Sequence, residues 1–299
     1  MRLDNFDLNL LVAFETLLEE RSVTRAAQRL NVTQSAMSAA LKRLRESFQD
    51  ELLVLHGKRM VPTQHALTLA PEVAAALVRL RSLIATGTAF DPATSRRRFH
   101  IDASDYITTV LLVPLIALLQ EEAPGVRLDL SLPSAESNRR LENGEIDLLI
   151  TPQEFLESDH PRELVFDERH VVVGCRDNPV FRRPITREAF LASGHVAVRI
   201  FGRDSFIETI LTKAVPERSI EVIAQSFIQV PWLLRGTRRL AVMHERLAKV
   251  SAPVFGLAIR EAPFELPVMH EMMQHHVTRA SDAGLGWLRE RLKVFAMTS

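Results

Sequence analysis

The sequence predicts an α+β amino-terminal part, a long connecting helix and an α/β remainder. Apolar residues recur at helical spacing up to about residue 48 and are followed by a short hairpin pattern. An apolar stripe then marks one long helix between residues 63 and 85. From Arg98 onward, strand and helix patterns alternate. Residues 90–98, which are rich in small, polar and basic side chains, are the best candidate for a linker between the two parts.

The first three expected helices are short and closely spaced. Residues 6–18 form a helix with an apolar face, and residues 23–30 form a second one, capped by Ser22 or Thr24. The pair Ala26–Ala27 lets a neighbouring helix approach closely. After a turn, Thr33 caps a third helix that runs to about Phe48. Because residues 21–45 also carry six basic side chains and no acidic one, the pattern predicts a helix-turn-helix.

The third helix presents its polar residues in an order that suits DNA. Met37, Leu41 and Leu44 face inward, which leaves small polar side chains at the end that enters a groove and cations where phosphates lie. Residues 51–62 predict a hairpin with a basic tip, so a winged helix-turn-helix is the natural assembly. The alternative is an ordinary amphipathic helix pair with solvated charges. The predicted DNA-binding residues are Arg25, Thr33, Gln34, Ser35, Ser38, Lys42, Arg43, Arg45, Lys58 and Arg59.

The long helix carries Val73, Leu77, Leu80 and Ile84 at steps of four and three residues. Such a stripe suits a coiled-coil seam between two chains, and it also suits packing on the helix's own domain. We favour the dimer contact, because DNA readers of this type use two heads on two half-sites.

The remainder of the chain reads as short strands separated by helices. This alternation predicts open parallel sheets, whose ligands bind beyond the carboxyl ends of the strands. The expected helices cover residues 106–122, 187–191, 206–214, 227–235 and 282–295. The expected strands cover residues 99–103, 126–132, 146–151, 170–174, 195–200 and 221–224.

Composition fits a globular protein and limits the classes that remain. The 299 residues are 46% hydrophobic and 25% charged with zero net charge, so DNA binding must come from local charge segregation. The single cysteine, Cys175, excludes an internal disulfide, and with no signal-like start this predicts the cytoplasm. The most apolar stretch, residues 110–119, contains Pro114 and is too short to span a bilayer.

Catalytic signatures are weak, and neither enzymatic activity nor a metal or other cofactor is expected. The run His270–His276 suggests a metalloprotease motif, but its histidines lie five apart instead of four, and Pro267 and Val268 favour a strand. The sequence lacks a phosphate-binding loop of the GxxxxGK type and a GxSxG elbow. Two classes remain: a DNA-binding regulator, and a small-molecule binding protein or enzyme with an incidental helical appendage.

Several motifs resemble those of LysR-type transcriptional regulators. The most specific is the run Ser22–Arg45; Pro62–Thr63, Asn143–Leu148 and Gly286–Leu288 also fit, whereas Leu55–His56 replaces a common arginine in the wing. Asp7–Leu11 and Met37–Ala40 resemble the subgroup of nodulation regulators and aromatic-acid sensors. The resemblance implies a DNA-binding domain over 1–62, a linker or dimerisation helix over 63–90 and an effector domain over 91–299.

The same resemblance implies an effector site between two lobes like those of periplasmic binding proteins. Exposed amides near Ser104 would hold a carboxylate, and Phe227 would supply a flat wall, so the expected effector is aromatic or acidic. The implied partners are double-stranded promoter DNA, the effector, RNA polymerase, and further copies in a homodimer or homotetramer. The implied effector residues are Ser104, Tyr106, Thr108, Thr151, His170, Gly202, Ser205, Phe227 and Pro267.

Overall fold

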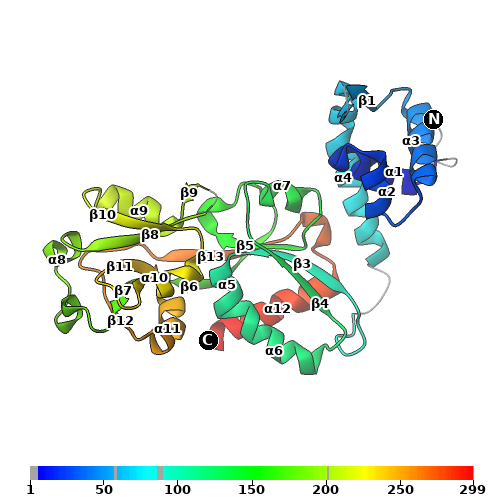
Figure 1. The fold of residues 1–299 in the computed structure, drawn as a ribbon. Helices are drawn as coiled ribbons and strands as arrows, with labels where there is room; N and C mark the ends of the chain where they lie inside the picture. Colours follow the sequence, from blue (N-terminus) through cyan, green and yellow to red (C-terminus); the bar gives the residue numbers. More distant parts are fainter. Residues whose placement is uncertain (1–5, 57–58, 86–89, 201, 299) are drawn as a thin grey trace. The chain divides into compact units, whose positions relative to one another are not determined.

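The computed structural model describes residues 6–56, 59–85, 90–200 and 202–298. The chain forms two compact units, one built on residues 1–88 and 142–144 and the other on residues 89–141 and 145–299 (Figure 1). Each unit has its own apolar core.

The first unit is the predicted winged helix-turn-helix. Helices α1 (Asn9–Glu20), α2 (Val23–Arg29) and α3 (Gln34–Phe48) precede the antiparallel hairpin of β1 (Leu53–His56) and β2 (Arg59–Pro62). Helix α4 (Gln64–Ala85) follows.

Local capping explains where the two central helices begin. The Ser22 hydroxyl accepts a hydrogen bond from the Arg25 amide at 3.4 Å, and the Thr33 hydroxyl accepts one from the Ala36 amide at 3.1 Å. Asn31 makes the intervening turn with a φ of 55°. Ala26 is fully buried, as expected of a residue that lets a second helix approach closely. The predicted helix-turn-helix is therefore confirmed.

Helix α4 packs on its own unit along part of the predicted stripe. Val73 and Leu77 are buried in the core that α1 and α3 also form, and Leu80 is half-buried. Ile84 lies in α4, but its side chain is outside the described residues. The burial of Val73 and Leu77 is thus explained without a second chain, and dimerisation through α4 stays a prediction.

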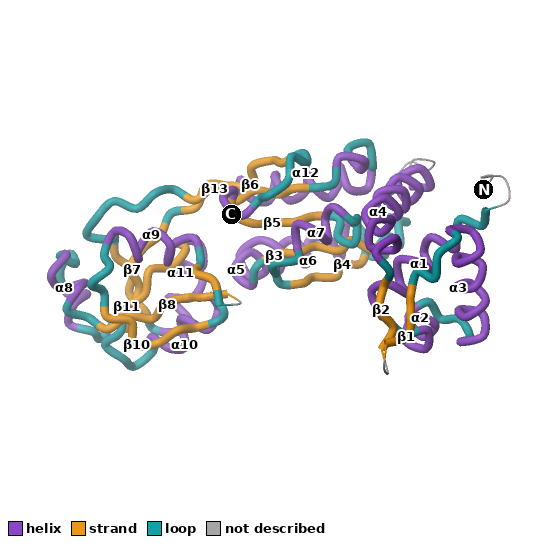
Figure 2. Tube along the Cα trace, turned by 90° about the horizontal axis from the view of Figure 1, so that it is seen from above, coloured by secondary structure: helices purple, strands orange, loops and turns teal. Residues whose placement is uncertain are grey.

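The second unit has two lobes, each built on one sheet (Figures 1 and 2). Lobe 1 has the strand order β4-β3-β5-β13-β6 and lobe 2 the order β10-β8-β11-β7-β12, with β9 paired to β8. Lobe 1 contains β3 (Arg98–Ala103), β4 (Arg127–Ser131), β5 (Leu148–Pro152), β6 (Arg162–Glu168) and β13 (Met269–Gln274). Lobe 2 contains β7 (His170–Cys175), β8 (Gly194–Ile200), β9 (Arg203–Asp204), β10 (Ser219–Ala224), β11 (Leu240–His244) and β12 (Leu257–Arg260).

The expectation of parallel sheets was wrong, because both sheets are mixed. β3 runs parallel to β4 and β5, but β13 runs antiparallel to both β5 and β6. In lobe 2, β8 runs parallel to β10 and β11, whereas β7 runs antiparallel to β11 and β12. The chain crosses between lobes from β6 to β7 and returns from β12 to β13. After its return to lobe 1, β13 runs antiparallel to its neighbours β5 and β6. The alternation of strands and helices along the sequence does not reveal this direction.

Helices cover both sheets. The expected helix over 106–122 is a continuous run with a π-helical turn in its middle, which the sequence did not predict. Helices α7 and α11 were also missed. The elements are α5 (Asp105–Ile107), η2 (Thr108–Leu112), α6 (Val113–Glu122), α7 (Ser137–Glu142), η3 (Gln153–Phe155), η4 (Pro179–Arg182), α8 (Arg187–Leu191), α9 (Phe206–Ala214), η5 (Phe227–Gln229), α10 (Val230–Leu234), α11 (Glu245–Phe255), η6 (Val277–Arg279) and α12 (Ala283–Thr298).

Among the described residues, the helices do not combine the length and apolarity that a membrane crossing requires.

Candidate functional site

The outer side of α3 presents the predicted DNA-reading residues. Gln34, Ser35 and Ser38 are exposed, while Met37 and Leu41 on the opposite side are buried. Thr33 is exposed and caps the helix, and its hydroxyl lies 2.9 Å from that of Ser35. Short polar side chains at the start of an exposed helix are suited to the edges of bases in a major groove.

The predicted cations differ in what they can contact. The Lys42 side chain is 79% exposed, and its ammonium lies 4.0 Å from the Glu46 carboxylate. Arg43 forms an exposed ion pair with Asp7 at 3.2 Å, and Arg25 forms one with Glu20 at 3.3 Å. Such exposed pairs hold their partners weakly, so these cations remain available to phosphates.

Arg45 instead organises the start of the wing. Its guanidinium donates hydrogen bonds to the backbone carbonyls of Glu51 at 2.9 Å and Leu53 at 2.7 Å. This role was not anticipated from the sequence, which placed Arg45 with the outward cations. Lys58 lies outside the described residues, and so does the side chain of Arg59, whose backbone lies in β2.

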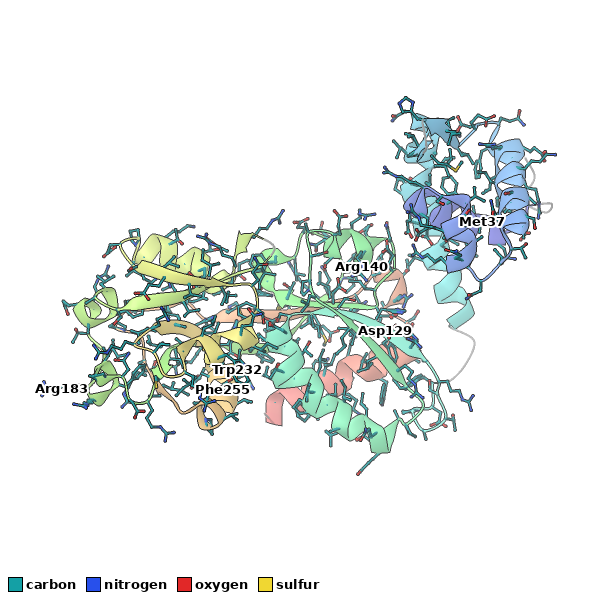
Figure 3. The ribbon with its side chains drawn as sticks, in the orientation of Figure 1. Met37, Asp129, Arg140, Arg183, Trp232 and Phe255 are labelled. Carbon is teal, nitrogen blue, oxygen red and sulfur yellow. The ribbon has the colours of Figure 1, made fainter. Side chains whose placement is uncertain are left out.

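We expect the double variant Lys42→Ala/Arg43→Ala to weaken DNA binding and to flatten its salt dependence. Each lost phosphate contact lowers the slope of log K against log salt by about 0.9, so the slope should fall by up to about 2. Titrations of a labelled duplex at several salt concentrations measure this. The matched control is Arg182→Ala/Arg183→Ala, which removes two exposed cations from lobe 2; Figure 3 labels Arg183. An unchanged slope in the first variant would contradict the assignment of α3.

A cavity of about 610 Å³ lies between the two lobes of the second unit. Its walls come from both sheets at the carboxyl ends of strands: Ser104 follows β3, Thr151 lies near the end of β5, Gln225 follows β10 and His244 ends β11. This is where ligands bind in open α/β sheets. Five of the predicted effector residues line the cavity: Ser104, Tyr106, Thr151, Ser205 and Phe227.

The other four predicted effector residues lie elsewhere. His170 and Pro267 line a second hollow of about 290 Å³ beside the two interlobe crossovers. Thr108 and Gly202 are not among the lining residues of either hollow. Thr108 is the first residue of the π-helical turn, and Gly202 adopts a positive φ of 76° next to β9.

Three rings form one wall of the interlobe cavity. The Tyr106 ring stacks on the His244 ring with centroids 3.8 Å apart, and Phe227 meets His244 edge-on at 4.8 Å. The Tyr106 hydroxyl donates a hydrogen bond to the Glu168 carboxylate, which also accepts one from the Arg246 amide at 3.2 Å. Burial raises the pKa of Tyr106 well above 10 and raises the pKa of Glu168. The wall is therefore flat, with an uncharged phenol.

Burial also keeps the neighbouring histidines neutral. Register places His244 opposite His170 on adjacent strands, and their ring centroids lie 4.9 Å apart. Desolvation lowers the pKa of His170 to about 4, and it lowers the pKa of the fully buried His244 as well. Among the described residues, neither ring nitrogen of His170 has a hydrogen-bond partner.

The expected carboxylate cradle near Ser104 is partly filled by the protein itself. The Ser104 hydroxyl accepts a hydrogen bond from the Ile107 amide at 3.1 Å, and the Thr108 amide donates to the Ser104 carbonyl at 2.8 Å. Two of the amides that were expected to face an acidic effector are thus already engaged.

The cavity also contains titratable residues that were not predicted from the sequence. Asp105 follows directly after Ser104, so its position beside the predicted strand end was a usable signal. Glu271 and His244 gave no such signal, because β13 and β11 bring them in from elsewhere in the chain. The acidic lining residues are Asp105, Glu154, Glu157, Asp204 and Glu271, and Arg203 is the basic one.

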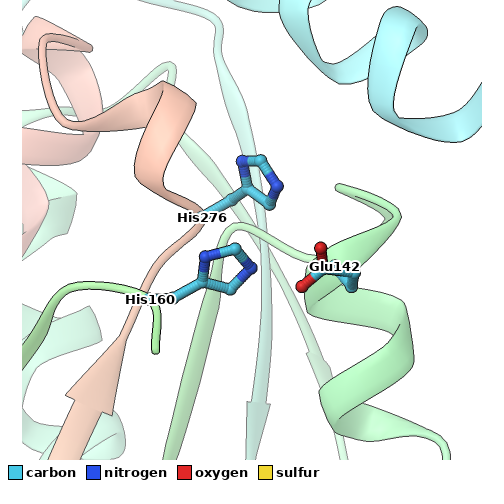
Figure 4. Close-up of side chains that lie close together, drawn as sticks. All are labelled: Glu142, His160 and His276. Carbon is cyan, nitrogen blue, oxygen red and sulfur yellow. The ribbon is translucent and has the colours of Figure 1, made fainter. Parts of the chain in front are cut away.

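The run His270–His276 has structural roles. Residues 269–274 form strand β13 instead of a helix, and His270 pairs with Asp167 at 2.7 Å. His276 caps η6, because its Nδ1 accepts a hydrogen bond from the Thr278 amide at 3.2 Å. The ring of His160 lies 4.3 Å from that of His276; Figure 4 shows both together with Glu142, the last residue of α7. The strand geometry removes the helical histidine spacing of a zinc protease.

The sequence matches two family models that together span most of the chain. Residues 8–67 match the bacterial regulatory helix-turn-helix protein, lysR family, and residues 92–294 match the LysR substrate binding domain. The chain belongs to the LysR family of transcriptional regulators. The members of this family are regulators and not enzymes, which excludes the enzyme alternative for this LysR-family protein.

Relatives and solved structures agree with this assignment. The chain is 40% identical to nodulation protein D 2 of Rhizobium tropici over 296 residues, covering 98% of this chain and 93% of that protein. It is 35% identical to a probable transcriptional regulator from Pseudomonas aeruginosa, with a TM-score of 0.68 and 98% of each chain covered. Full-length OxyR from the same organism, with a cysteine-to-aspartate substitution, shares the fold at 20% identity, with a TM-score of 0.73 and coverage of 98% and 95%.

Proposed function

We propose that this LysR-family regulator responds to an aromatic effector that binds in the 610 Å³ cavity between its lobes. The observation that carries the proposal is the lining of this cavity, which takes residues from the strand ends of both lobes. Its volume falls in the range of small-molecule sites. The stacked rings of Tyr106 and His244 and the edge of Phe227 provide flat surfaces on which an aromatic ring can pack.

Effector binding controls DNA binding through the lobes. Among the described residues, two crossovers join the lobes: Arg169 between β6 and β7 and residues 261–268 between β12 and β13. A ligand that contacts both lobes favours the lobe arrangement that it binds best. In an oligomer this changes the spacing of the winged helices and therefore the bend of the bound DNA.

The regulator acts as a homodimer or homotetramer in the cytoplasm and contacts RNA polymerase at the promoter. A monomer presents a single recognition helix, whereas two half-sites need two. Lobe 2 also exposes apolar surface that suits a subunit contact: Trp232 packs edge-on against Phe255 at 4.7 Å and remains 65% exposed (Figure 3). Val254 on α11 is 73% exposed.

Footprinting on the DNA upstream of the regulator's own gene tests the proposal. The purified protein is examined alone and with a panel of aromatic carboxylates and their uncharged analogues. We expect protection of an interrupted palindrome whose extent changes with at least one compound. Protection that no aromatic compound changes would reject the proposed effector class, and absence of protection at low salt would reject promoter recognition at this site.

A further inference from the structure

The Asp105 carboxylate bridges the two lobes at the wall of the cavity. Asp105 is the first residue of α5 in lobe 1, and its carboxylate accepts a hydrogen bond from the Ser226 hydroxyl of lobe 2. It also accepts hydrogen bonds from the backbone amides of Phe227 and Ile228, each at 3.3 Å. These amides are the type of donor that holds a ligand carboxylate, and here a carboxylate of the protein already occupies them.

The charge of Asp105 is not cancelled by an ion pair among the described residues of this unit. Asp204, a further lining carboxylate, pairs with Arg199 at 2.7 Å, and Arg203 is the basic lining residue. Glu154 and Glu157 add two more acidic side chains to the lining. A ligand carboxylate that entered the cavity would therefore meet like charges in a partly desolvated space.

Glu271 is a buried acidic residue of the same cavity. It is only 1% exposed, lines the cavity, and has no side-chain hydrogen-bond partner among the described residues. Strand β13 places it opposite Pro152 of β5 and Phe166 of β6, so its backbone position is fixed by pairing on both sides. Burial and the nearby Glu168 and Glu154 raise the pKa of Glu271 well above 4.5, which favours the protonated carboxyl over the carboxylate.

A buried carboxylic acid with no partner is unfavourable unless a ligand completes its hydrogen bonding. As an O–H donor, Glu271 suits an uncharged ligand oxygen, such as a carbonyl, hydroxyl or ether. With a carboxylate ligand, the same hydrogen bond would form only against the repulsion from Asp105.

We propose that Asp105 and Glu271 determine the charge specificity of the cavity: Glu271 binds an uncharged oxygen of the effector, and Asp105 excludes anionic analogues. This inference rests on the proposed effector site and adds the electrical charge of its ligand. The inference therefore favours an uncharged aromatic effector over an acidic one.

The test compares ligand pairs that differ only in charge. The pairs are aromatic amides and their carboxylates, built on one ring (4-hydroxybenzamide and 4-hydroxybenzoate) and on two fused rings. Affinities for the full chain are measured by calorimetry at pH 7. For at least one pair, we expect the amide to bind at least about tenfold more tightly than the carboxylate. Equal or tighter binding of the carboxylates would overturn the proposal, and so would a lack of binding by every amide.

Variants separate the two residues. Asp105→Asn should bring the carboxylate to within about threefold of its amide partner, because the repulsion is removed. Glu271→Leu should weaken amide binding by at least about tenfold, whereas Glu271→Gln, which keeps a donor, should retain it within about threefold. An unchanged amide-to-carboxylate ratio in Asp105→Asn would rule out its role, and unchanged amide binding in Glu271→Leu would rule out that of Glu271.

Two controls distinguish charge from disruption of the lobes. Ser226→Ala removes one interlobe hydrogen bond but keeps the negative charge, so the ratio should stay as in the wild type. Asp129→Asn removes an exposed carboxylate that pairs with Arg98 on β3, and it should also leave the ratio unchanged (Figure 3).

Footprints on promoter DNA are recorded with the same pairs of amides and carboxylates. A footprint that responds only to a carboxylate would support effector control of DNA binding but reject the proposed preference for uncharged ligands. Tight amide binding without a changed footprint would support that preference but reject effector control by these compounds.

Discussion

Lowering the pH from 7 to 5 is expected to decrease the free energy of unfolding by about 2 kcal/mol through the titration of His170 alone. The folded ring has a pKa of about 4, because it is desolvated, while an unfolded histidine has a pKa near 6.5. Below pH 6.5 the unfolded chain therefore binds a proton that the folded chain does not. The penalty is absent above pH 6.5, grows as the pH falls and levels off below about pH 4. His195, whose pKa is also lowered to about 4 by burial, adds a similar effect.

Urea unfolding of the full chain between pH 7.5 and pH 5 measures this for the variant His170→Leu. Its free energy of unfolding should exceed that of the wild type by about 2 kcal/mol more at pH 5 than at pH 7.5, because leucine does not titrate. The control Phe99→Leu changes a fully buried ring on β3 of lobe 1, and it should shift stability equally at both pH values. Parallel pH curves for His170→Leu and the wild type would contradict the assignment.

Replacing Arg218 by methionine is expected to lower the free energy of unfolding of the second unit by about 3–5 kcal/mol. Arg218 forms an ion pair with Glu208 of α9, and both side chains are almost completely buried. Removing the arginine leaves the Glu208 carboxylate in an apolar environment without its partner. A buried charge in that state is far less stable than either the intact pair or two apolar side chains.

A double-mutant cycle tests the coupling between these two residues. Glu208→Leu alone should also be strongly destabilising, but the double variant Arg218→Met/Glu208→Leu should recover at least about 2 kcal/mol relative to the sum of the single changes. The control pair is Arg187 and Glu217 of the same lobe, which lie 3.4 Å apart and are about half exposed. Arg187→Met should change stability by less than about 1 kcal/mol. Additive effects at Arg218 and Glu208 would mean that the buried pair is not coupled.

Local signals in the sequence were sufficient for the first unit. The caps Ser22 and Thr33, the alanines of α2 and the spacing of Met37, Leu41 and Leu44 act within a few residues of one another. The six expected strands of the second unit also appear with nearly the expected limits. Strand β6 was not among the predicted strands, because charged residues interrupt its apolar pattern, and β9, β11 and β12 were missed as well. β6 pairs with β13, which lies more than 100 residues further along the chain, so the burial of β6 depends on a long-range contact.

The lining of the cavity between the lobes was only half predictable. Ser104, Tyr106 and Phe227 were assigned by resemblance and do line it. His170 and Pro267 were assigned in the same way, but they lie at the second hollow. Strand direction and register decide which side of a sheet end a residue reaches, and neither is encoded in local spacing.

The sequence by itself determined the winged helix-turn-helix, the long helix α4 and the alternation of strands and helices, because these depend on contacts close along the chain. Only the tertiary structure decided that both sheets are mixed and that Val73 and Leu77 pack within their own unit. It also decided that Asp105 and Glu271, 166 positions apart in sequence numbering, line one cavity. The physical reason is that β13 returns from lobe 2 to pair with β5 and β6 of lobe 1, and this long-range pairing brings a buried acid to the cavity between the lobes.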